Sequence, residues 1–199
     1  MLTRRTLLTA CAALAVAPMA RADGADVASQ LIDKLLHDLI ATVNGPGSIE
    51  DKRAALAKIV DATVDVTAVA RFCLGRYWRS ATEAQQGEYT ELFHRVLVSS
   101  VTSKVGDYRG DTFTIGHSIQ RADGSVVPTV LTCPGNAPNK VDWLVSTASG
   151  SAKLVDVIAE GVSLRLTQRD DYAAYLARNN NNVQALIDAM RQQADTPQG

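Results

Sequence analysis

The chain has 199 residues, with 20 basic and 21 acidic side chains and a formal net charge of −1 at pH 7. Its hydrophobic content of 46% is typical of a globular protein with an apolar core. Because there is no basic excess, we expect neither nucleic-acid binding nor electrostatic attraction to an anionic membrane surface.

The first 22 residues have the composition of a secretory signal peptide. A basic pair, Arg4 and Arg5, precedes an apolar stretch at 6–19, and the Ala-Arg-Ala sequence at 20–22 has the spacing of a cleavage site. The surrounding residues are close to the twin-arginine export pattern, with an ordinary Sec signal as the alternative. We therefore predict an exported periplasmic protein whose mature chain, 23–199, forms a single domain.

Cleavage would remove Arg4, Arg5 and Arg21, which leaves 17 basic against 21 acidic residues and a net charge of −4. The mature chain has no apolar stretch long enough to cross a membrane. It keeps Cys73 and Cys133, which could form a disulfide in an oxidising compartment. Two separate buried thiols are the simpler interpretation, because the spacing alone does not show that they meet.

The N-terminal part of the mature chain has the apolar periodicity of helices. Hydrophobic residues three, four and seven positions apart predict a helix at about 26–43, ended by the Asn-Gly-Pro-Gly sequence at 44–47. Ser48 and Asp51 have the spacing of a capping box, which predicts the start of a second helix. A short third helical segment ends near 74–75.

A second capping box, Thr82 and Gln85, predicts the start of the longest helix in the chain, which should end before Gly106. This helix is long enough to span a small domain. Its apolar stripe consists of Tyr89, Leu92, Phe93, Val96, Leu97, Val101 and Val105.

After Gly110 apolar and polar residues alternate, which predicts strands. Four strands are expected, at about 113–117, 126–132, 141–146 and 153–158, with a tight Asp-Gly turn at 123–124. Pro128 has no backbone N–H, so it indicates an edge strand or a bulge. Strands joined by such short turns form an antiparallel meander that buries one face.

The chain returns to a helical pattern at Ser163, and a last short helix is expected at 183–190. The helices before the sheet would cover its buried face. We therefore predict one α+β domain, in which a helical layer packs on a small curved antiparallel four-stranded sheet of the NTF2-like or cystatin-like kind.

Motifs for catalysis or metal binding are missing from the sequence. The Gly-Val-Ser sequence at 161–163 is not a nucleophile elbow, because Arg165 stands where a glycine is required. His37, His94 and His117 have no metal-like spacing, so each is interpreted as a surface or half-buried side chain. We expect a binding protein without a cofactor.

One enzymatic alternative remains open at this point. A curved sheet covered by helices can hold a ketosteroid-isomerase type of site, in which an inward Asp works with a Tyr. Asp142, Asp156 and Tyr77 are the candidates for these roles. The competing interpretation places both acids on the solvated face of the sheet.

Three segments in order resemble the MlaC family of periplasmic phospholipid-binding proteins, also called toluene-tolerance auxiliary proteins. They are Leu-Gly-Arg-Tyr-Trp at 74–78, Ala-Thr-Glu-Ala-Gln at 81–85 and Asp-Val-Ile-Ala-Glu-Gly-Val-Ser at 156–163, joined by the helix that carries Phe93. The sequence departs from the family at Ala152, where a Trp commonly stands. This difference bears on the packing at the start of the fourth strand and on the size of the pocket.

The resemblance implies a deep apolar pocket for lipid acyl chains. It also implies a shuttle, here expected to be a monomer, between an outer-membrane lipoprotein complex and an inner-membrane ABC transporter, which would serve outer-membrane lipid asymmetry. Some members of the family occur beside hopanoid biosynthesis genes, so a hopanoid-type polycyclic lipid is the alternative ligand.

We expect the walls of this pocket to come from the long helix and the inner face of the sheet, although each residue would serve equally well in an ordinary core. The predicted wall residues are Leu74, Tyr77, Phe93, Leu97, Val101, Val130, Trp143, Val145, Val157, Ile158 and Val162. Burial of one acyl chain at about 0.8 kcal/mol per methylene contributes on the order of ten kcal/mol, so release into water would be slow. A phosphate head group is costly to desolvate and should stay in solvent, which agrees with the lack of a strong basic cluster in the sequence.

Overall fold

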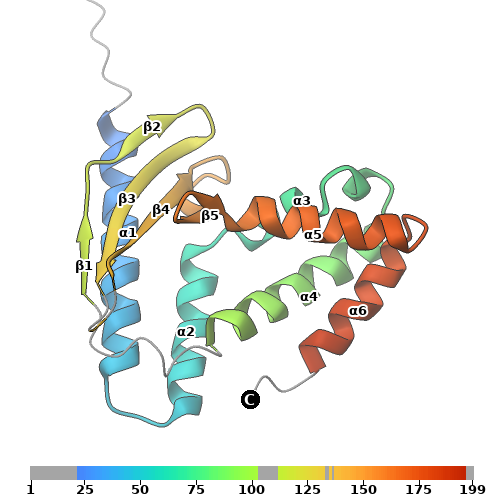
Figure 1. Ribbon diagram of the computed structural model, residues 1–199, viewed down its shortest axis with the longest axis horizontal. Helices are drawn as coiled ribbons and strands as arrows, with labels where there is room; N and C mark the ends of the chain where they lie inside the picture. Colours follow the sequence, from blue (N-terminus) through green and yellow to red (C-terminus); the bar gives the residue numbers. More distant parts are fainter. Residues whose placement is uncertain (1–21, 103–111, 133–134, 136, 196–199) are drawn as a thin grey trace, which may run out of the picture.

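The structure, a computed structural model, describes residues 22–102, 112–132, 135 and 137–195. Residues 1–21 of the signal peptide predicted at 1–22 lie outside these residues, as do Val105 and Cys133. The described residues fold into six α-helices, one 3₁₀ segment and a six-stranded sheet, which confirms the α+β class (Figure 1). None of the helices in the described residues combines the length and apolar composition that a membrane span requires.

The helices before the sheet follow the predicted order. Their bounds are Ala22–Asn44 for α1, Ile49–Thr63 for α2, Val66–Leu74 for α3, Gly75–Arg79 for the 3₁₀ segment η1 and Glu83–Thr102 for α4. Both capping boxes are present: Asp51 N–H donates to Ser48 Oγ at 3.1 Å, and Gln85 N–H donates to Thr82 Oγ1 at 3.2 Å. These local hydrogen bonds satisfy helix N–H groups that lack a partner within the helix.

The sheet contains the four predicted strands and two further short ones. The predicted strands are β1 (Thr112–Ile115), β3 (Gly124–Thr132), β4 (Asn139–Ser146) and β5 (Lys153–Ala159). The structure adds β2 (Ile119–Arg121) and β6 (Val162–Ser163), so the predicted number of strands, four, was too low. All pairs are antiparallel, in the order β1-β3-β4-β5-β6 with β2 paired to β3.

The sequence predicts either an edge strand or a bulge at Pro128. Pro128 lies in β3, an interior strand, so the first of these alternatives is wrong. The neighbouring strand is instead interrupted beside it, between the end of β1 and the start of β2. Gly116 N–H donates to Pro128 O at 2.8 Å in this interruption. Proline has no N–H to offer in return, so pairing cannot continue as a regular ladder on this side. His117, the last residue of the strand predicted at 113–117, lies in the same interruption and outside β1.

One face of the sheet packs against α1. Val127 pairs with Trp143 and Trp143 pairs with Val157, so these three side chains share a face. They form a hydrophobic cluster with α1 residues such as Ile32, and half-buried Ala152 packs against this cluster at the start of β5. This sheet and α1 core is the first of two main cores in the molecule.

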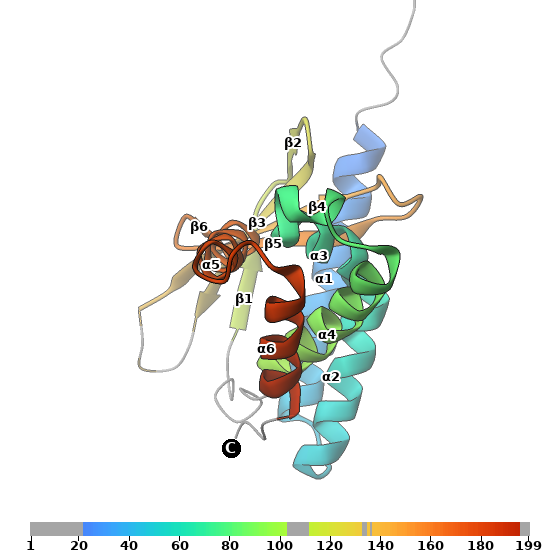
Figure 2. The same ribbon diagram turned by 90° about the vertical axis from the view of Figure 1, so that its right-hand side faces the viewer.

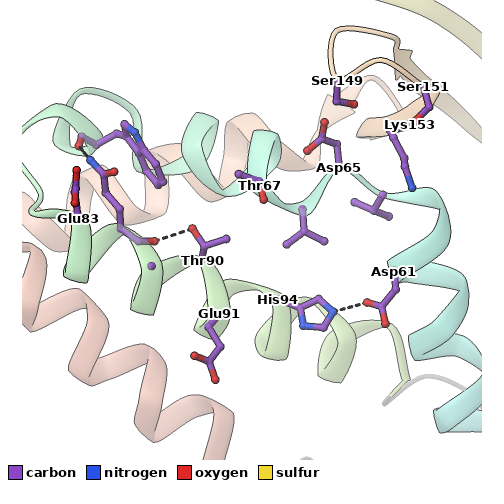
Figure 3. Close-up of a pocket in the computed structure, with 15 residues that line it drawn as sticks. Asp61, Asp65, Thr67, Glu83, Thr90, Glu91, His94, Ser149, Ser151 and Lys153 are labelled. Atoms are coloured by element: carbon purple, nitrogen blue, oxygen red, sulfur yellow. Dashed lines mark hydrogen bonds and ion pairs between the residues drawn. The ribbon is translucent and has the colours of Figure 1, made fainter.

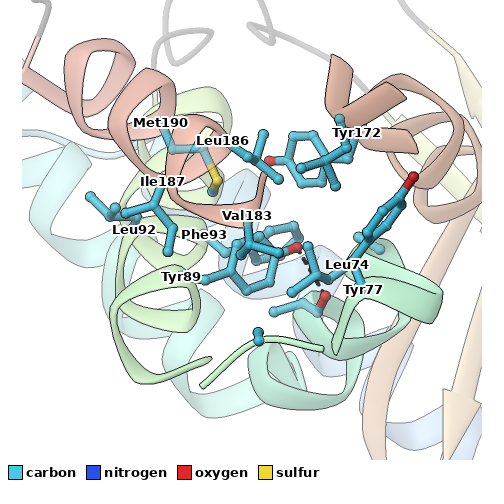
Figure 4. Packing of buried hydrophobic residues seen from close by; sticks show 14 residues of the cluster. Leu74, Tyr77, Tyr89, Leu92, Phe93, Tyr172, Val183, Leu186, Ile187 and Met190 are labelled. Atoms are coloured by element: carbon cyan, nitrogen blue, oxygen red, sulfur yellow. Dashed lines mark hydrogen bonds between the residues drawn. The ribbon is translucent and has the colours of Figure 1, made fainter. Parts of the chain in front are cut away.

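The second core lies within the helices. It joins α3, η1 and α4 to α5 (Leu164–Arg178) and α6 (Val183–Asp195), and α4 packs mainly on α6 (Figures 1 and 2). Tyr89 at its centre is fully buried and donates a hydrogen bond to Ala70 O at 2.9 Å (Figure 4). Burial raises the pKa of Tyr89 above its usual range, so its hydroxyl stays protonated.

Cys73 lies in this helical core, is almost completely buried and has no disulfide partner among the described residues. Its Sγ lies 3.5 Å from Arg165 O. Burial raises the pKa of this thiol to about 12, so it remains protonated and unreactive at neutral pH. The proposed partner Cys133 lies outside the described residues, and the disulfide stays untested.

We predict that Ile187→Ala lowers the free energy of unfolding by about 2–5 kcal/mol, because Ile187 is fully buried in the helical core and its truncation leaves a cavity. Ile49→Ala is the matched control, since Ile49 is 58% exposed and should change stability by less than about 0.5 kcal/mol. Urea denaturation followed by circular dichroism measures both. Equal effects of the two substitutions would contradict the assignment of this core.

Candidate functional site

The structure distributes the predicted wall residues over both cores and both faces of the sheet. Leu74, Tyr77 and Phe93 are buried in the helical core, and half-buried Leu97 packs against it (Figure 4). Trp143, Val145 and Val157 belong to the sheet and α1 core. The remaining members lie elsewhere, with Val101 half-buried in the last turn of α4, Val130 and Ile158 on the other face of the sheet, and Val162 exposed in β6.

The predicted walls therefore do not pack against one another. The sheet is contacted mainly by α1, α3 and α5, whereas α4 contacts α6, α3 and α2. Val157 and Ile158 are consecutive strand residues, and consecutive side chains point to opposite faces of a sheet. They cannot line the same wall, although both are apolar.

Asp156 is the acidic residue that the sequence left unexplained within a buried strand. Its side chain is only 3% exposed, and it accepts hydrogen bonds from Ser163 Oγ at 2.6 Å and from Arg165 N–H at 3.1 Å. Arg165 Nε lies 3.3 Å from the same carboxylate, and Arg165 Nη2 reaches Asp123 at 3.2 Å. Asp156 thus joins β5 to the first turn of α5, where a negative charge is favoured.

Ser163 has a second role at the same junction. Its hydroxyl oxygen accepts a hydrogen bond from Leu166 N–H at 3.1 Å, which makes Ser163 the N-cap of α5, as its sequence position suggests. The serine and the buried acid therefore act as one structural unit, and neither has the surroundings of a nucleophile or general base.

The residues of the enzymatic alternative are held by other partners. Tyr77 donates a hydrogen bond to Asn181 Oδ1 at 2.7 Å and accepts one from Arg76 Nη2 at 2.8 Å. Asp156 is held by Ser163 and Arg165. Asp142 lies on the same face of the sheet, in the neighbouring strand β4, where it pairs with Ile158. No interaction between described residues joins Tyr77 to either acid, so the structure does not assemble an acid and base pair from them.

A groove of about 880 Å³, lined by both charged and apolar side chains, lies between the α2–α3 connection, α4 and the turn before β5 (Figure 3). Four carboxylates line it, from Asp61, Asp65, Glu83 and Glu91. His94 Nε2 lies 2.6 Å from Asp61 Oδ1 and joins α4 to α2. Acyl chains would leave these charged groups without solvation, so this groove does not fit the predicted apolar pocket.

These acids do not form a metal site. No group of three or more His, Cys, Asp or Glu side chains is close enough to hold a metal ion within the part of the chain that the structure describes. His37 and His117 are exposed and His94 is half-buried, as the sequence predicts.

A second groove, of about 530 Å³, is strongly basic. Arg71, Arg76, Arg79 and Arg169 line it together with Ala68, Phe72, Gly75 and Trp78. We call it the arginine groove. The expectation that the protein lacks a basic cluster was therefore wrong, because α3, η1 and α5 bring together arginines that are separated in the sequence.

Neither groove contains any of the predicted wall residues. The spacing of Arg71, Arg76 and Arg79 within nine residues was the available signal for the arginine groove. Their segment was interpreted only through its resemblance to a family motif. Arg169 joins the groove only through the packing of α5 on α3, so no pattern in the neighbouring sequence could have identified it.

Comparison with known proteins gives consistent matches over nearly the whole chain. Residues 29–192 match the family described as MlaC protein. The toluene tolerance protein Ttg2D of Pseudomonas putida is 27% identical over 192 residues, which cover 93% of this chain and 87% of that protein. A phospholipid-binding protein from Ralstonia solanacearum, solved in complex with a phospholipid, superposes with a TM-score of 0.71. At 20% identity, over 84% of this chain and 96% of that chain, this match shows a shared fold.

We predict that Asp156→Asn lowers the free energy of unfolding by about 2–4 kcal/mol, because it leaves the Arg165 charge without its buried counter-charge. Asp123→Asn is the control, since Asp123 is 56% exposed and its ion pair should contribute less than about 1 kcal/mol. Urea denaturation at neutral pH measures both variants. If Asp156→Asn were no more destabilised than Asp123→Asn, the junction would not have the structural role assigned to it.

Proposed function

The chain belongs to the MlaC protein family, and we propose on this basis that it is a periplasmic carrier that binds the acyl chains of a phospholipid. The observation that carries this proposal is the fold shared with the Ralstonia solanacearum protein, which was solved with a phospholipid bound. We further propose that the carrier works as a monomer between an outer-membrane lipoprotein complex and an inner-membrane ABC transporter. The protein is on this view a transport protein and not an enzyme.

The separation of the two cores supports a role for lipid in completing the interior. Leu97 and Val101 of α4 are half-buried, Ile158 is half-buried on the sheet, and Val130 is 38% exposed. They come from α4 and from the sheet face opposite α1, and α4 packs on α6, α3 and α2 rather than on the sheet. We propose that acyl chains cover these residues, so that apolar surface from both sides is removed from water.

The predicted wall residues that lie at the centres of the two cores have a supporting role in this proposal. Leu74, Phe93 and Val145 are packed by protein side chains and hold α3, α4 and β4 in place. Burial of a long acyl chain would contribute on the order of ten kcal/mol before ordering costs. Release would therefore require a partner that offers an equally apolar path.

We predict that protein purified from the periplasm carries a lipid that native mass spectrometry detects. A mass and fragmentation pattern of a diacyl phospholipid supports the proposal, and a pentacyclic mass would replace the phospholipid by a hopanoid-type cargo. Protein that is empty, and stays empty after incubation with phospholipid vesicles, would contradict the carrier function.

We predict that Val101→Trp reduces lipid loading at least about tenfold, because an indole ring would occupy space that an acyl chain needs. Val27→Trp, at a position that is 45% exposed on α1, is the matched control and should load normally. The measurement is the ratio of loaded to empty protein in native mass spectra, with circular dichroism to verify the fold. Normal loading of a folded Val101→Trp variant would place the acyl chains elsewhere.

A further inference from the structure

We propose that the arginine groove is a binding site for phosphate esters, distinct from the apolar cargo site. Its four arginines come from the consecutive elements α3 and η1 and from α5, which is far from both in the sequence. None of its eight lining residues carries a carboxylate. The groove therefore gathers positive charge on a chain that has more acidic than basic residues.

Aromatic rings hold several of these guanidinium groups in place. Arg71 lies over the ring of Trp78 at 5.8 Å, and Arg169 lies over Phe72 at 5.1 Å. Arg76 lies over Tyr77 at 4.9 Å and donates a hydrogen bond to its hydroxyl. Such cation–π contacts use the face of the guanidinium and leave its N–H edge available to an anion.

Gly75 allows Arg169 to approach the backbone at the floor of the groove. Its φ of +58° lies in the left-handed region, and a Cβ at this position would be only 3.1 Å from Arg169 Nε. Any other residue would be strained and would push Arg169 away. This turn thus fixes the distance between the arginine of α5 and those of α3 and η1.

The four arginines, Arg71, Arg76, Arg79 and Arg169, have no ion-pair partner among the residues that the structure describes. By contrast, Arg165 contacts Asp156 and Asp123, and Arg191 contacts Glu88 and Asp188. A cluster of positioned cations without internal partners creates a local field that attracts an anion from outside.

A phosphate ester fits this arrangement better than a carboxylate. A phosphate offers several oxygens that accept hydrogen bonds from more than one guanidinium, whereas a carboxylate offers two. The groove volume of about 530 Å³ suits a small polar group. Phosphate esters occur on lipid head groups and on soluble metabolites. The arginine groove would bind the phosphate group that both contain.

The test compares vesicles of a neutral galactolipid that contain phosphatidylglycerol with vesicles made equally anionic by oleate. The variant is the triple substitution Arg71→Gln, Arg79→Gln and Arg169→Gln, all at exposed positions. The charge-matched control replaces Arg53, Lys58 and Arg121, which are also exposed, by Gln. Glycerol 3-phosphate, titrated by calorimetry, serves as the soluble phosphate ester.

We expect full-length mature protein to prefer phosphatidylglycerol over oleate vesicles, and the arginine variant to bind them about tenfold or more weakly than the control variant. Binding of glycerol 3-phosphate that the arginine variant loses would assign the site to soluble esters as well. Binding to vesicles alone would assign it to lipid phosphates at a membrane surface.

Equal binding to both kinds of vesicle would overturn the inference, because it would show attraction by net charge alone. So would unchanged phosphate-ester binding by the arginine variant. Acyl-chain loading, followed by native mass spectrometry, should be normal in this variant. A loss of head-group binding with normal loading therefore separates this inference from the proposed carrier function.

Discussion

The junction between β5 and α5 determines how the two halves of this protein meet. Asp156 is buried in the middle of β5 and receives hydrogen bonds from Ser163 and from the first turn of the helix that follows. A buried carboxylate is costly unless its hydrogen bonds and charge are satisfied, so this network allows one geometry of the corner and disfavours others. Figure 1 shows α5 leaving the sheet at this corner and running toward α6, and the helical core is built along it.

Because the helical layer is attached at this corner, each half can fill its own interior without the other. Val127 and Val145 are buried against α1 on one face of the sheet, while Tyr89 and Ile187 are buried among the helices. Val69 of α3 is one link between the halves, since it packs on Val126, Leu144 and Val155 of the opposite sheet face, and α5 also contacts β5. The apolar residues beyond this link remain partly exposed, which is an unusual condition for a protein unless another apolar molecule covers them.

The sequence predicts the local features of this structure well and the tertiary ones poorly. Capping boxes at Ser48 and Thr82 depend on residues three positions apart, and their hydrogen bonds form as expected. The short strands β2 and β6 were missed because two or three residues show no periodicity. An uninterrupted apolar run identified Val157 and Ile158 as strand residues, but it could not show that only Val157 faces α1. The family resemblance supplied the class of cargo, which no spacing of residues contains.

The net charge can be counted from the sequence, but the distribution of charged side chains over the surface depends on the fold. The excess of acidic residues predicts repulsion from anionic lipid. This repulsion applies at long distances, where the net charge of the whole protein determines the interaction. Salt reduces this range to about 8 Å at physiological ionic strength, so at contact only nearby groups matter. There the fold places acids and arginines on either side of Trp78, which lines both grooves. A protein with this arrangement is oriented as it approaches a phosphate-bearing surface, because only the arginine side is attracted.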